Sequence, residues 1–284
     1  MNNRFLIKFR TSRIRDIMFG SSVAKKIKEE YGLCELHFDV NFLQTIDLLN
    51  NNPYVDKVLY KESENEYNKI FEIKDDDVED TSDISVVKQI QLLCGIKNTD
   101  DNFNIYTNPT TDYGIRRSIS DLIDTNTWHP DTIKVCYVMD LERRSYSPES
   151  NYEKNRNLNK ILNVLYDKNI MLFAVGLDDT SSKKFPSLNS TSRFSFTTSM
   201  IKVSDYVLGP EGCLTYLSAS LGIPTILTTD YLYKQYGTKF NKLYMGPEKY
   251  FPDNKNFYLN YDLSDEELGR QILNIISNGW RSTD

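Results

Sequence analysis

The chain has 284 residues, a net charge of −6 and 12% aromatic residues, a length that allows one large domain or two of ordinary size. The acidic balance argues against an extended nucleic-acid surface. No apolar run is long enough to span a membrane, and the first residues lack the apolar core of a signal peptide. Four cysteines without C-x-x-C spacing and two histidines argue against a structural zinc site and favour reduced thiols in a cytoplasmic setting.

Strands and helices alternate along the first 125 residues. Residues 4–10 alternate in polarity and predict a first strand, followed by a helix that ends at Gly32, a typical residue after a helix end. Further strands are predicted at "CELHFDV", "VDKVLY" and "EYNKIFEI", and helices at "NFLQTIDLLNNN" and "SVVKQIQLLCGI". The order βαβαββα predicts an open, mostly parallel sheet with helices on its faces.

The pattern begins again after "TNTWHPDT". Strands are predicted at "IKVCYVM", "IMLFAVG", "DYVLG" and "PTILTT", and helices at "NYEKNRNLNKILNVLYDKN", 213–221 and "LSDEELGRQILNIISN". In the last helix Ser264 and Glu267 have the spacing of a capping box. We therefore predict an α/β chain with two Rossmann-like domains, 1–125 and 126–260, and a C-terminal helix in 261–284. A single large α/β domain is the alternative.

The turn in "DYVLGPEGCLTYL" is the strongest candidate for a ligand site. Ligands of open parallel sheets bind beyond the carboxyl ends of the strands, and Gly209 and Gly212 allow a ligand to approach the backbone closely. The start of the following helix offers backbone N–H groups and a positive dipole end to a diphosphate. Glu211 would repel a phosphate, so it suits a hydroxylated group such as a sugar. Alternatively, it only favours the helix N-terminus.

These residues carry a family resemblance. The segment "SDYVLGPEGCLTYLSASLGIPTI" resembles the donor-site motif of the heptosyltransferase-like GT-B glycosyltransferases (the ADP-heptose:lipopolysaccharide heptosyltransferase family). The passages "FLIKFRTSRIRDIMFGSSVAKKIKEEYG" and "NNPYVDKVLY" are similar to the family's first and second units, so the resemblance covers most of the chain. It implies two Rossmann-like domains that face each other across a cleft. The nucleotide sugar would lie mainly on the C-terminal domain and the acceptor on the N-terminal one, the last helix would return to the N-terminal domain, and no metal or other cofactor would be needed.

The donor motif also departs from the family. Leu214, Leu217 and Ala219 match it, whereas four other positions have changed residue type. The predicted donor-binding residues in this segment are Pro210, Glu211, Gly212, Cys213, Leu214 and Tyr216. Tyr216, at the family's histidine position, would either bond to the donor or pack in the core. We therefore expect a retained scaffold with a donor other than ADP-heptose.

Glycosyl transfer needs a base for the acceptor hydroxyl and positive charge for the departing diphosphate. The resemblance implies that Asp16 is the base; its alternative is a helix N-cap for a helix starting at the next residue. Arg143 or Arg144 would bind the donor phosphates, since an arginine side chain can form two parallel hydrogen bonds with phosphate oxygens. Arg13 and Arg15 are candidates for binding an anionic acceptor or phosphate. Solvated surface charge is the alternative for all four arginines.

The triplet "DDD" at 75–77 has the form of a metal-binding D-x-D motif. It stands in a run of acidic residues away from a Gly-rich context, which favours a solvated acidic loop and no metal site.

The expected function is transfer of a sugar from a nucleotide-diphosphate sugar to an acceptor hydroxyl. A glycan or a lipid-linked, lipopolysaccharide-type saccharide is the leading acceptor. One alternative is a viral glycosyltransferase acting on hydroxymethylated DNA bases, whose binding would depend steeply on salt. The other is a non-catalytic nucleotide-sugar-binding or scaffold protein.

Overall fold

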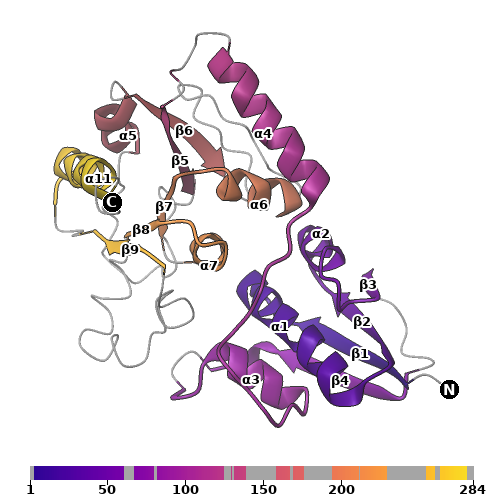
Figure 1. The fold of residues 1–284 in the computed structure, drawn as a ribbon. Coiled ribbons are helices and arrows are strands. Elements are labelled where there is room, and N and C mark those ends of the chain that lie inside the picture. Colours follow the sequence, from indigo (N-terminus) through magenta and orange to yellow (C-terminus); the bar gives the residue numbers. More distant parts are fainter. Residues whose placement is uncertain are drawn as a thin grey trace. The chain divides into compact units, whose positions relative to one another are not determined.

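The computed structural model describes residues 3–60, 67–79, 82–124, 129, 131–138, 158–166, 169–175, 194–210, 212–228, 254–259 and 263–279. The chain divides into two compact units. Of the described residues, those up to Asn108 form the first unit together with 194–195, and the others form the second. Each unit contains one parallel sheet (Figure 1).

The first unit is a parallel sheet of four strands in the order β3-β2-β1-β4. The chain leaves β1 for β2 and β3 on one side and returns to β4 on the other side of β1. The strands are β1 (Asn3–Arg10), β2 (Cys34–Val40), β3 (Lys57–Tyr60) and β4 (Lys69–Lys74), and the helices are α1 (Ile14–Tyr31), α2 (Ile46–Asn50) and α3 (Val86–Leu93), with 3₁₀ turns η1 (Leu43–Thr45) and η2 (Asp75–Asp77). All the strands and helices predicted for this half are present.

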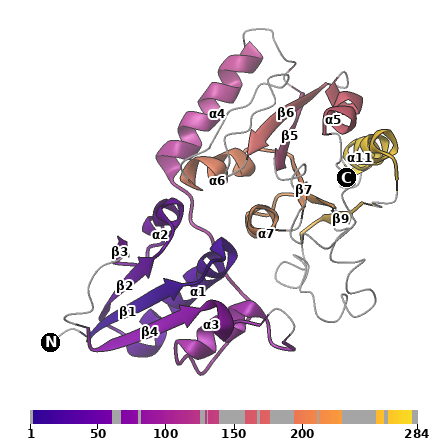
Figure 2. The ribbon, with the colours of Figure 1, turned by 180° about the vertical axis from the view of Figure 1, so that it is seen from behind.

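Helix α1 packs closely on β1. The rings of Phe5 and Tyr31 lie 4.9 Å apart. A β-carbon at Gly20 would lie 2.3 Å from the ring of the fully buried Phe9, so only glycine allows this approach. Because residues four apart share a helix face, Asp16 lies on the same side of α1 as Gly20, one turn closer to the end of β1. Figure 2 shows this sheet from the side opposite α1.

The second unit is a parallel sheet of five strands in the order β6-β5-β7-β8-β9. The chain passes from β5 to β6 on one side and later to β7 on the other. The elements are α4 (Pro109–Asp124), β5 (Ile133–Val138), α5 (Leu158–Tyr166), β6 (Ile170–Val175), α6 (Phe194–Lys202), β7 (Tyr206–Pro210), α7 (Cys213–Ser220), β8 (Thr225–Thr228), β9 (Asn256–Tyr258) and α11 (Asp265–Gly279). Helices α5 and α11 cover one face, and α6 and α7 lie on the other (Figure 1). The sequence analysis missed α4, α6 and β9.

Helix α4 is tied to α6 by a buried carboxylate. Asp112 accepts hydrogen bonds from Ser199 Oγ and Lys202 Nζ, both at 2.6 Å. Residues 109–124 therefore pack within the second unit, although the domain boundary predicted at residue 125 assigned them to the first domain.

The C-terminal helix begins with the predicted capping box. Glu267 N donates to Ser264 Oγ at 3.3 Å, and Ser264 N donates to Glu267 Oε2 at 3.0 Å. The sequence analysis expected this helix to return to the N-terminal domain. Instead, its apolar face is buried against α5, and a β-carbon at Gly269 would lie 2.8 Å from the carbonyl oxygen of Ile161. The shared core includes Ile161, Leu162, Leu165, Leu268, Ile272 and Ile276.

Candidate functional site

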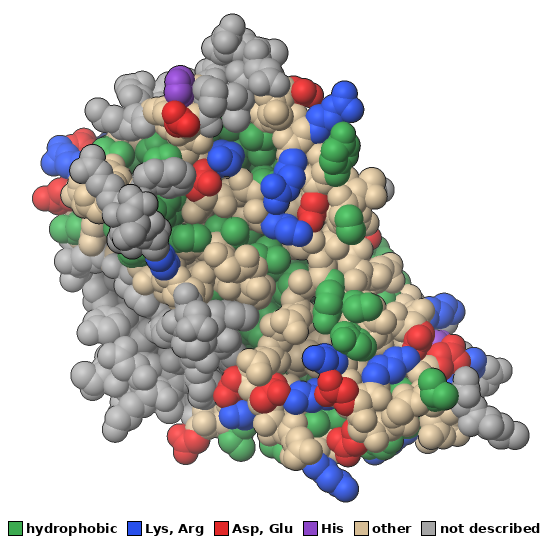
Figure 3. Space-filling view, in the orientation of Figure 1, with side chains coloured by type: hydrophobic (Ala, Val, Ile, Leu, Met, Phe, Trp, Pro, Cys, Tyr) green, Lys and Arg blue, Asp and Glu red, His purple; other side chains and the backbone are tan. Residues whose placement is uncertain are grey.

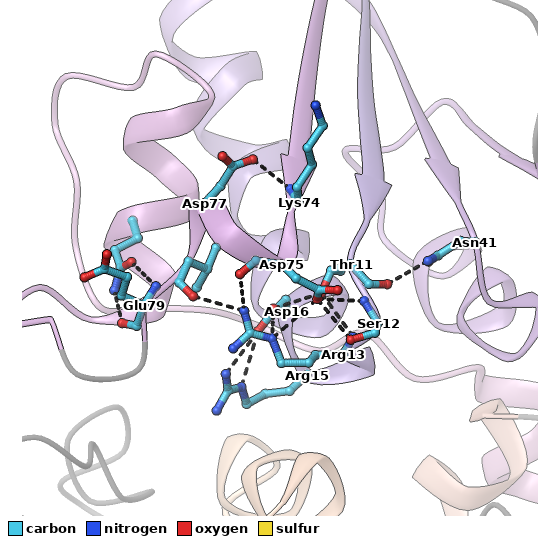
Figure 4. A network of polar contacts seen from close by, with 12 residues as sticks. Thr11, Ser12, Arg13, Arg15, Asp16, Asn41, Lys74, Asp75, Asp77 and Glu79 are labelled. Atoms are coloured by element: carbon cyan, nitrogen blue, oxygen red, sulfur yellow. Dashed lines mark hydrogen bonds and ion pairs between the residues drawn. The ribbon is translucent and has the colours of Figure 1, made fainter.

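The carboxyl edge of the first sheet gathers the ends of three neighbouring strands. Ligands of open α/β sheets bind beyond this edge, at the point where the chain switches sides, and here that point lies between β1 and β4. Arg10 and Lys74, the last residues of these two strands, are in register. The loop after β1 therefore meets η2, and Asn41 Nδ2, from the loop after β2, donates to the Thr11 carbonyl at 2.6 Å (Figure 4).

Asp16 lies at the centre of this network and is completely buried. Its Oδ2 is 2.9 Å from Arg13 Nε and 3.1 Å from Thr11 Oγ1, and its Oδ1 is 3.2 Å from Arg15 Nη2. Three predicted site residues thus come together. The alternative that Asp16 is the N-cap of a helix starting at Ile17 is wrong, because α1 begins at Ile14 and Arg13 occupies the cap position.

Burial raises the pKa of Asp16, while the positive charges of Arg15 and Arg13 oppose that rise without cancelling it. Burial acts in this direction because a low-dielectric environment disfavours the charged form of a carboxyl group. Asp16 is therefore a stronger base than an exposed aspartate, which is the property that general-base catalysis requires.

The two arginines are held in different ways. Arg13 Nη2 donates to the carbonyl oxygens of Asp75 at 2.8 Å and Val78 at 3.0 Å, so this side chain also fixes the chain after β4. Arg15 Nε and Nη2 both donate to Asp16 Oδ1, at 3.3 and 3.2 Å. Each guanidinium group is thus part of the network around Asp16 (Figure 4).

The sequence analysis missed the role of Asp75, which it placed in a solvated acidic loop. Asp75 Oδ1 accepts hydrogen bonds from Thr11 Oγ1 at 2.7 Å, Ser12 N at 2.8 Å and Ser12 Oγ at 3.1 Å. The hydrogen bond from Thr11, followed by that from Ser12 N–H, holds the pKa of Asp75 below its ordinary value. Among the described residues, no cluster of three or more His, Cys, Asp or Glu side chains is arranged to hold a metal ion.

We predict that Asp16→Asn changes the pH dependence of stability. As pH rises above 3.8, the ordinary pKa of this side chain, the unfolded chain loses the Asp16 proton before the folded chain does. The free energy of unfolding of the native protein should therefore fall relative to that of Asp16→Asn, until pH passes the folded pKa. Urea unfolding at a series of pH values measures this difference.

Glu267→Gln is a control of opposite sign. In the native protein, hydrogen bonds with Ser264 lower the pKa of Glu267. The native protein should therefore gain stability relative to Glu267→Gln as pH rises. If the native protein gains stability with rising pH relative to Asp16→Asn, as it should relative to Glu267→Gln, the arginines rather than burial control the ionisation of Asp16.

The turn after β7 occupies the equivalent position in the second sheet, where the chain switches sides between β5 and β7. A β-carbon at Gly209 would lie 2.7 Å from Val138 Cγ2, so this glycine permits close strand packing. Gly212 precedes α7 in an extended conformation, and no described atom lies within 4 Å of where its β-carbon would be. Gly212 N donates to Thr215 Oγ1 at 3.0 Å, which defines the helix start.

The other predicted donor-site residues have different environments. Leu214 and Tyr216 are 4% and 2% exposed, which favours a packing role for both side chains. Cys213 is half-buried, and no disulfide joins it to another described cysteine. Three predicted residues, Glu211, Arg143 and Arg144, lie outside the described residues, as does the side chain of Pro210.

An open groove of about 620 Å³ lies between β9 and α11. Its lining is Asn254, Lys255, Asn256, Phe257, Gln271, Asn274, Ile275 and Asn278. Asn254 and Lys255 precede β9 and Asn256 begins it, so the groove lies toward the amino end of the sheet, opposite the turn after β7. It is therefore separate from the candidate donor site.

Two surface properties bear on possible partners. None of the helices in the described part of the chain combines the length and apolar character needed to cross a membrane. Lys and Arg side chains are interspersed with Asp and Glu over the described surface of the first unit that is visible in Figure 3. That face therefore gives no support to the alternative of a DNA acceptor, which would favour a continuous basic surface.

No protein-family model and no curated protein matches the sequence. Solved structures, by contrast, are similar to this chain. A glycosyl transferase family 9 protein from Veillonella parvula DSM 2008 matches 98% of this chain and 91% of its own, with a TM-score of 0.62 and 8% identity.

Two E. coli proteins are also similar. The ADP-heptose LPS heptosyltransferase II matches 98% of this chain and 99% of its own, with a TM-score of 0.57 and 9% identity. The match to the heptosyltransferase WaaC, solved with ADP, covers 95% of this chain and 99% of WaaC, with a TM-score of 0.56 and 10% identity. At such identities the likeness establishes the fold. The chain therefore has the α/β GT-B fold of the heptosyltransferase-like glycosyltransferases, as the sequence resemblance predicted.

Proposed function

We propose that this protein is a glycosyltransferase that moves a sugar from a nucleotide-diphosphate donor to an acceptor hydroxyl group. The observation that carries the proposal is the position of Asp16: a buried carboxyl group with a raised pKa at the switch point of the first sheet. A base is needed at such a position to take the acceptor proton. The fold shared with three glycosyltransferase structures supports the reaction class.

The donor is assigned to the turn after β7. Backbone N–H groups at the start of α7 would face the diphosphate, with the positive end of the helix dipole stabilising its charge. Glu211 is proposed to accept hydrogen bonds from sugar hydroxyls, and Arg143 or Arg144 to bind phosphate oxygens. The reaction as proposed needs no metal ion or other cofactor.

The acceptor is assigned to the network around Asp16. Arg13 and Arg15 would bind an anionic group of a glycan or lipid-linked saccharide. Because both carboxylate oxygens already contact arginines, one guanidinium group must move before an acceptor hydroxyl reaches Asp16. In substrate-free enzymes, catalytic hydrogen bonds often reach their productive geometry only in the complex with substrate.

A second candidate is a non-catalytic nucleotide-sugar-binding protein. The observation that favours it is the complete burial of Asp16 between two arginines, an arrangement that would also serve a purely structural ion pair. The two candidates share the donor site and differ in whether sugar is transferred.

A thermal-shift screen of nucleoside diphosphates and their sugars tests the donor site. A ligand at a hundred times its dissociation constant should stabilise the protein by about 2.7 kcal/mol. Glu211→Ala should weaken binding of the sugar nucleotide much more than binding of the bare nucleotide. Equal losses would exclude the sugar-binding role of Glu211, and a complete absence of shifts would contradict the proposed function. Transfer assays with the donor thus identified then separate the two candidates.

A further inference from the structure

The hydroxyl group of Thr11 lies between two carboxylates from different parts of the chain. Its Oγ1 is 2.7 Å from Asp75 Oδ1 and 3.1 Å from Asp16 Oδ2. The backbone N–H of Arg13 donates to the same oxygen at 3.1 Å. Thr11 is completely buried, so its side chain must satisfy its hydrogen bonds within this network.

A hydroxyl group has one proton to donate and two lone pairs with which to accept. Thr11 therefore cannot donate to both carboxylates at once. The shorter distance favours donation to Asp75, and one lone pair already accepts from Arg13. The remaining lone pair then faces Asp16 Oδ2. This arrangement repels an ionised Asp16, whereas a protonated Asp16 can donate to Thr11.

We propose that Thr11 and Asp75 are positioning residues for Asp16: Thr11 donates its proton to Asp75 and thereby presents an acceptor to the protonated form of Asp16. This inference rests on the proposed role of Asp16 as the base. In that reaction the acceptor oxygen bonds to the anomeric carbon as the bond to the diphosphate breaks, and the acceptor proton passes to Asp16. Once the carboxyl group has turned so that this proton lies on Oδ2 and points to Thr11, the hydrogen bonds run from Asp16 to Thr11 and from Thr11 to Asp75, and Thr11 keeps its own proton.

Among the described residues, the charged groups that face Asp16 are Arg13 and Arg15 at the start of its own helix and, through Thr11, Asp75 just after β4. Both arginines favour the ionised form, as a hydrogen bond donated by Thr11 would. The proposed arrangement opposes them and favours the protonated form. In the opposite arrangement, with the Thr11 proton directed at Asp16, Thr11 would favour the ionised form too. The two arrangements therefore predict opposite effects when the hydroxyl group is removed.

The decisive measurement is the pKa of Asp16, followed by its carboxyl ¹³C chemical shift during a pH titration without any substrate. Thr11→Val keeps the shape of the side chain and removes the hydroxyl group, and we expect it to lower this pKa. Thr11→Ser, which keeps the hydroxyl group, should restore it. The added methyl group of valine would by itself raise the pKa, so a fall cannot be a side effect of lost polarity. A rise in Thr11→Val would overturn the proposal.

Asp75→Asn provides a second, independent measurement. It should also lower the pKa of Asp16, and more than Asp77→Asn, a neighbouring carboxylate that accepts from Lys74 N instead. If Asp75 acts through Thr11, adding Asp75→Asn to Thr11→Val should have little further effect. If the two Asn variants shift the pKa of Asp16 equally, or if the effects of Asp75→Asn and Thr11→Val add fully, then Asp75 acts on Asp16 only as a distant charge and not through Thr11. If Thr11→Val does not fold, Thr11→Ala, which also lacks the hydroxyl group, replaces it in the titration and in the double variant.

In transfer assays, loss of one such hydrogen bond should lower kcat by about twofold to tenfold and move the acidic limb of the pH profile to lower pH. The titration needs no activity, so the two proposals can fail separately. If the pKa of Asp16 shifts as expected in the variants but no sugar is transferred, the glycosyltransferase function is contradicted while the proposed arrangement of Thr11 stands.

Discussion

Asp16→Asn is expected to lower kcat/KM for sugar transfer by about 10²- to 10⁴-fold, the usual contribution of a general base. The asparagine amide has nearly the same shape as the carboxylate, and its oxygen can still accept from Arg15 while its NH₂ group can donate to Thr11, but it cannot take a proton from the acceptor hydroxyl. Single-turnover release of the nucleoside diphosphate, at saturating acceptor, measures the chemical step directly. The loss should appear in kcat, because the proton is transferred only in the transition state.

The control is Asp77→Asn, the same substitution in η2 at a carboxylate that bonds only to its own turn among the contacts described. It should leave the rate unchanged. Both variants should bind the donor nucleotide with the native dissociation constant, since the donor is assigned to the other unit. A rate that survives Asp16→Asn would remove Asp16 as the base. A native protein that binds nucleotide sugar and transfers nothing to any acceptor would favour the non-catalytic candidate.

The proton affinity of Asp16 also predicts the pH profile. Because burial raises its pKa, kcat/KM should fall as pH decreases through a value above the ordinary 3.8 for this side chain, since the protonated carboxyl group cannot act as a base. An acidic limb below that value would mean that the arginines control the ionisation of Asp16 when an acceptor is near.

Except for β9, the strands of both sheets could be predicted because their signals are local. The buried parallel strand "IMLFAV", for example, is a continuous apolar run with its own signal. Helix α4 also has a local signal, since Ile115 and Ile119 are buried four residues apart, but the Thr, Gly and Ser residues of the same segment conceal it. Strand β9 has only three residues, and it exists because they pair with β8. Pairing between distant segments cannot be deduced from a three-residue sequence.

The same distinction separates the site residues that were found from those that were missed. Asp16 and its arginines lie within four residues of each other, in a segment that a family resemblance identifies. Asp75 is remote in sequence, and it joins them only because β4 returns beside β1 with Arg10 opposite Lys74. The sequence rule that would have found it is topological: polar residues just after two strands meet when those strands are parallel neighbours. Applying that rule requires the strand order, which the sequence analysis did not derive.

Gly212→Ala is expected to weaken binding of the donor nucleotide about tenfold to a hundredfold while leaving the fold intact. The backbone at Gly212 is extended, which alanine adopts freely, and no described atom would touch the new methyl group. The methyl group would instead occupy the space through which a diphosphate approaches the first N–H groups of α7. Losing one hydrogen bond to a charged group costs about 1.5–3 kcal/mol, which corresponds to that range of dissociation constants. Isothermal titration calorimetry with the nucleotide measures it.

Two other glycines provide matched controls for this substitution. Gly114→Ala in α4 also places a methyl group where no described atom lies. It should leave nucleotide binding unchanged, and it should not lower the free energy of unfolding, because alanine is the better helix former. Gly209→Ala forces a methyl group against Val138 and should lower the free energy of unfolding by about 1–3 kcal/mol. A Gly212→Ala protein that loses stability as Gly209→Ala does would show that Gly212 serves the packing of the turn. If instead it binds nucleotide like the native chain, the diphosphate does not approach α7 through this position.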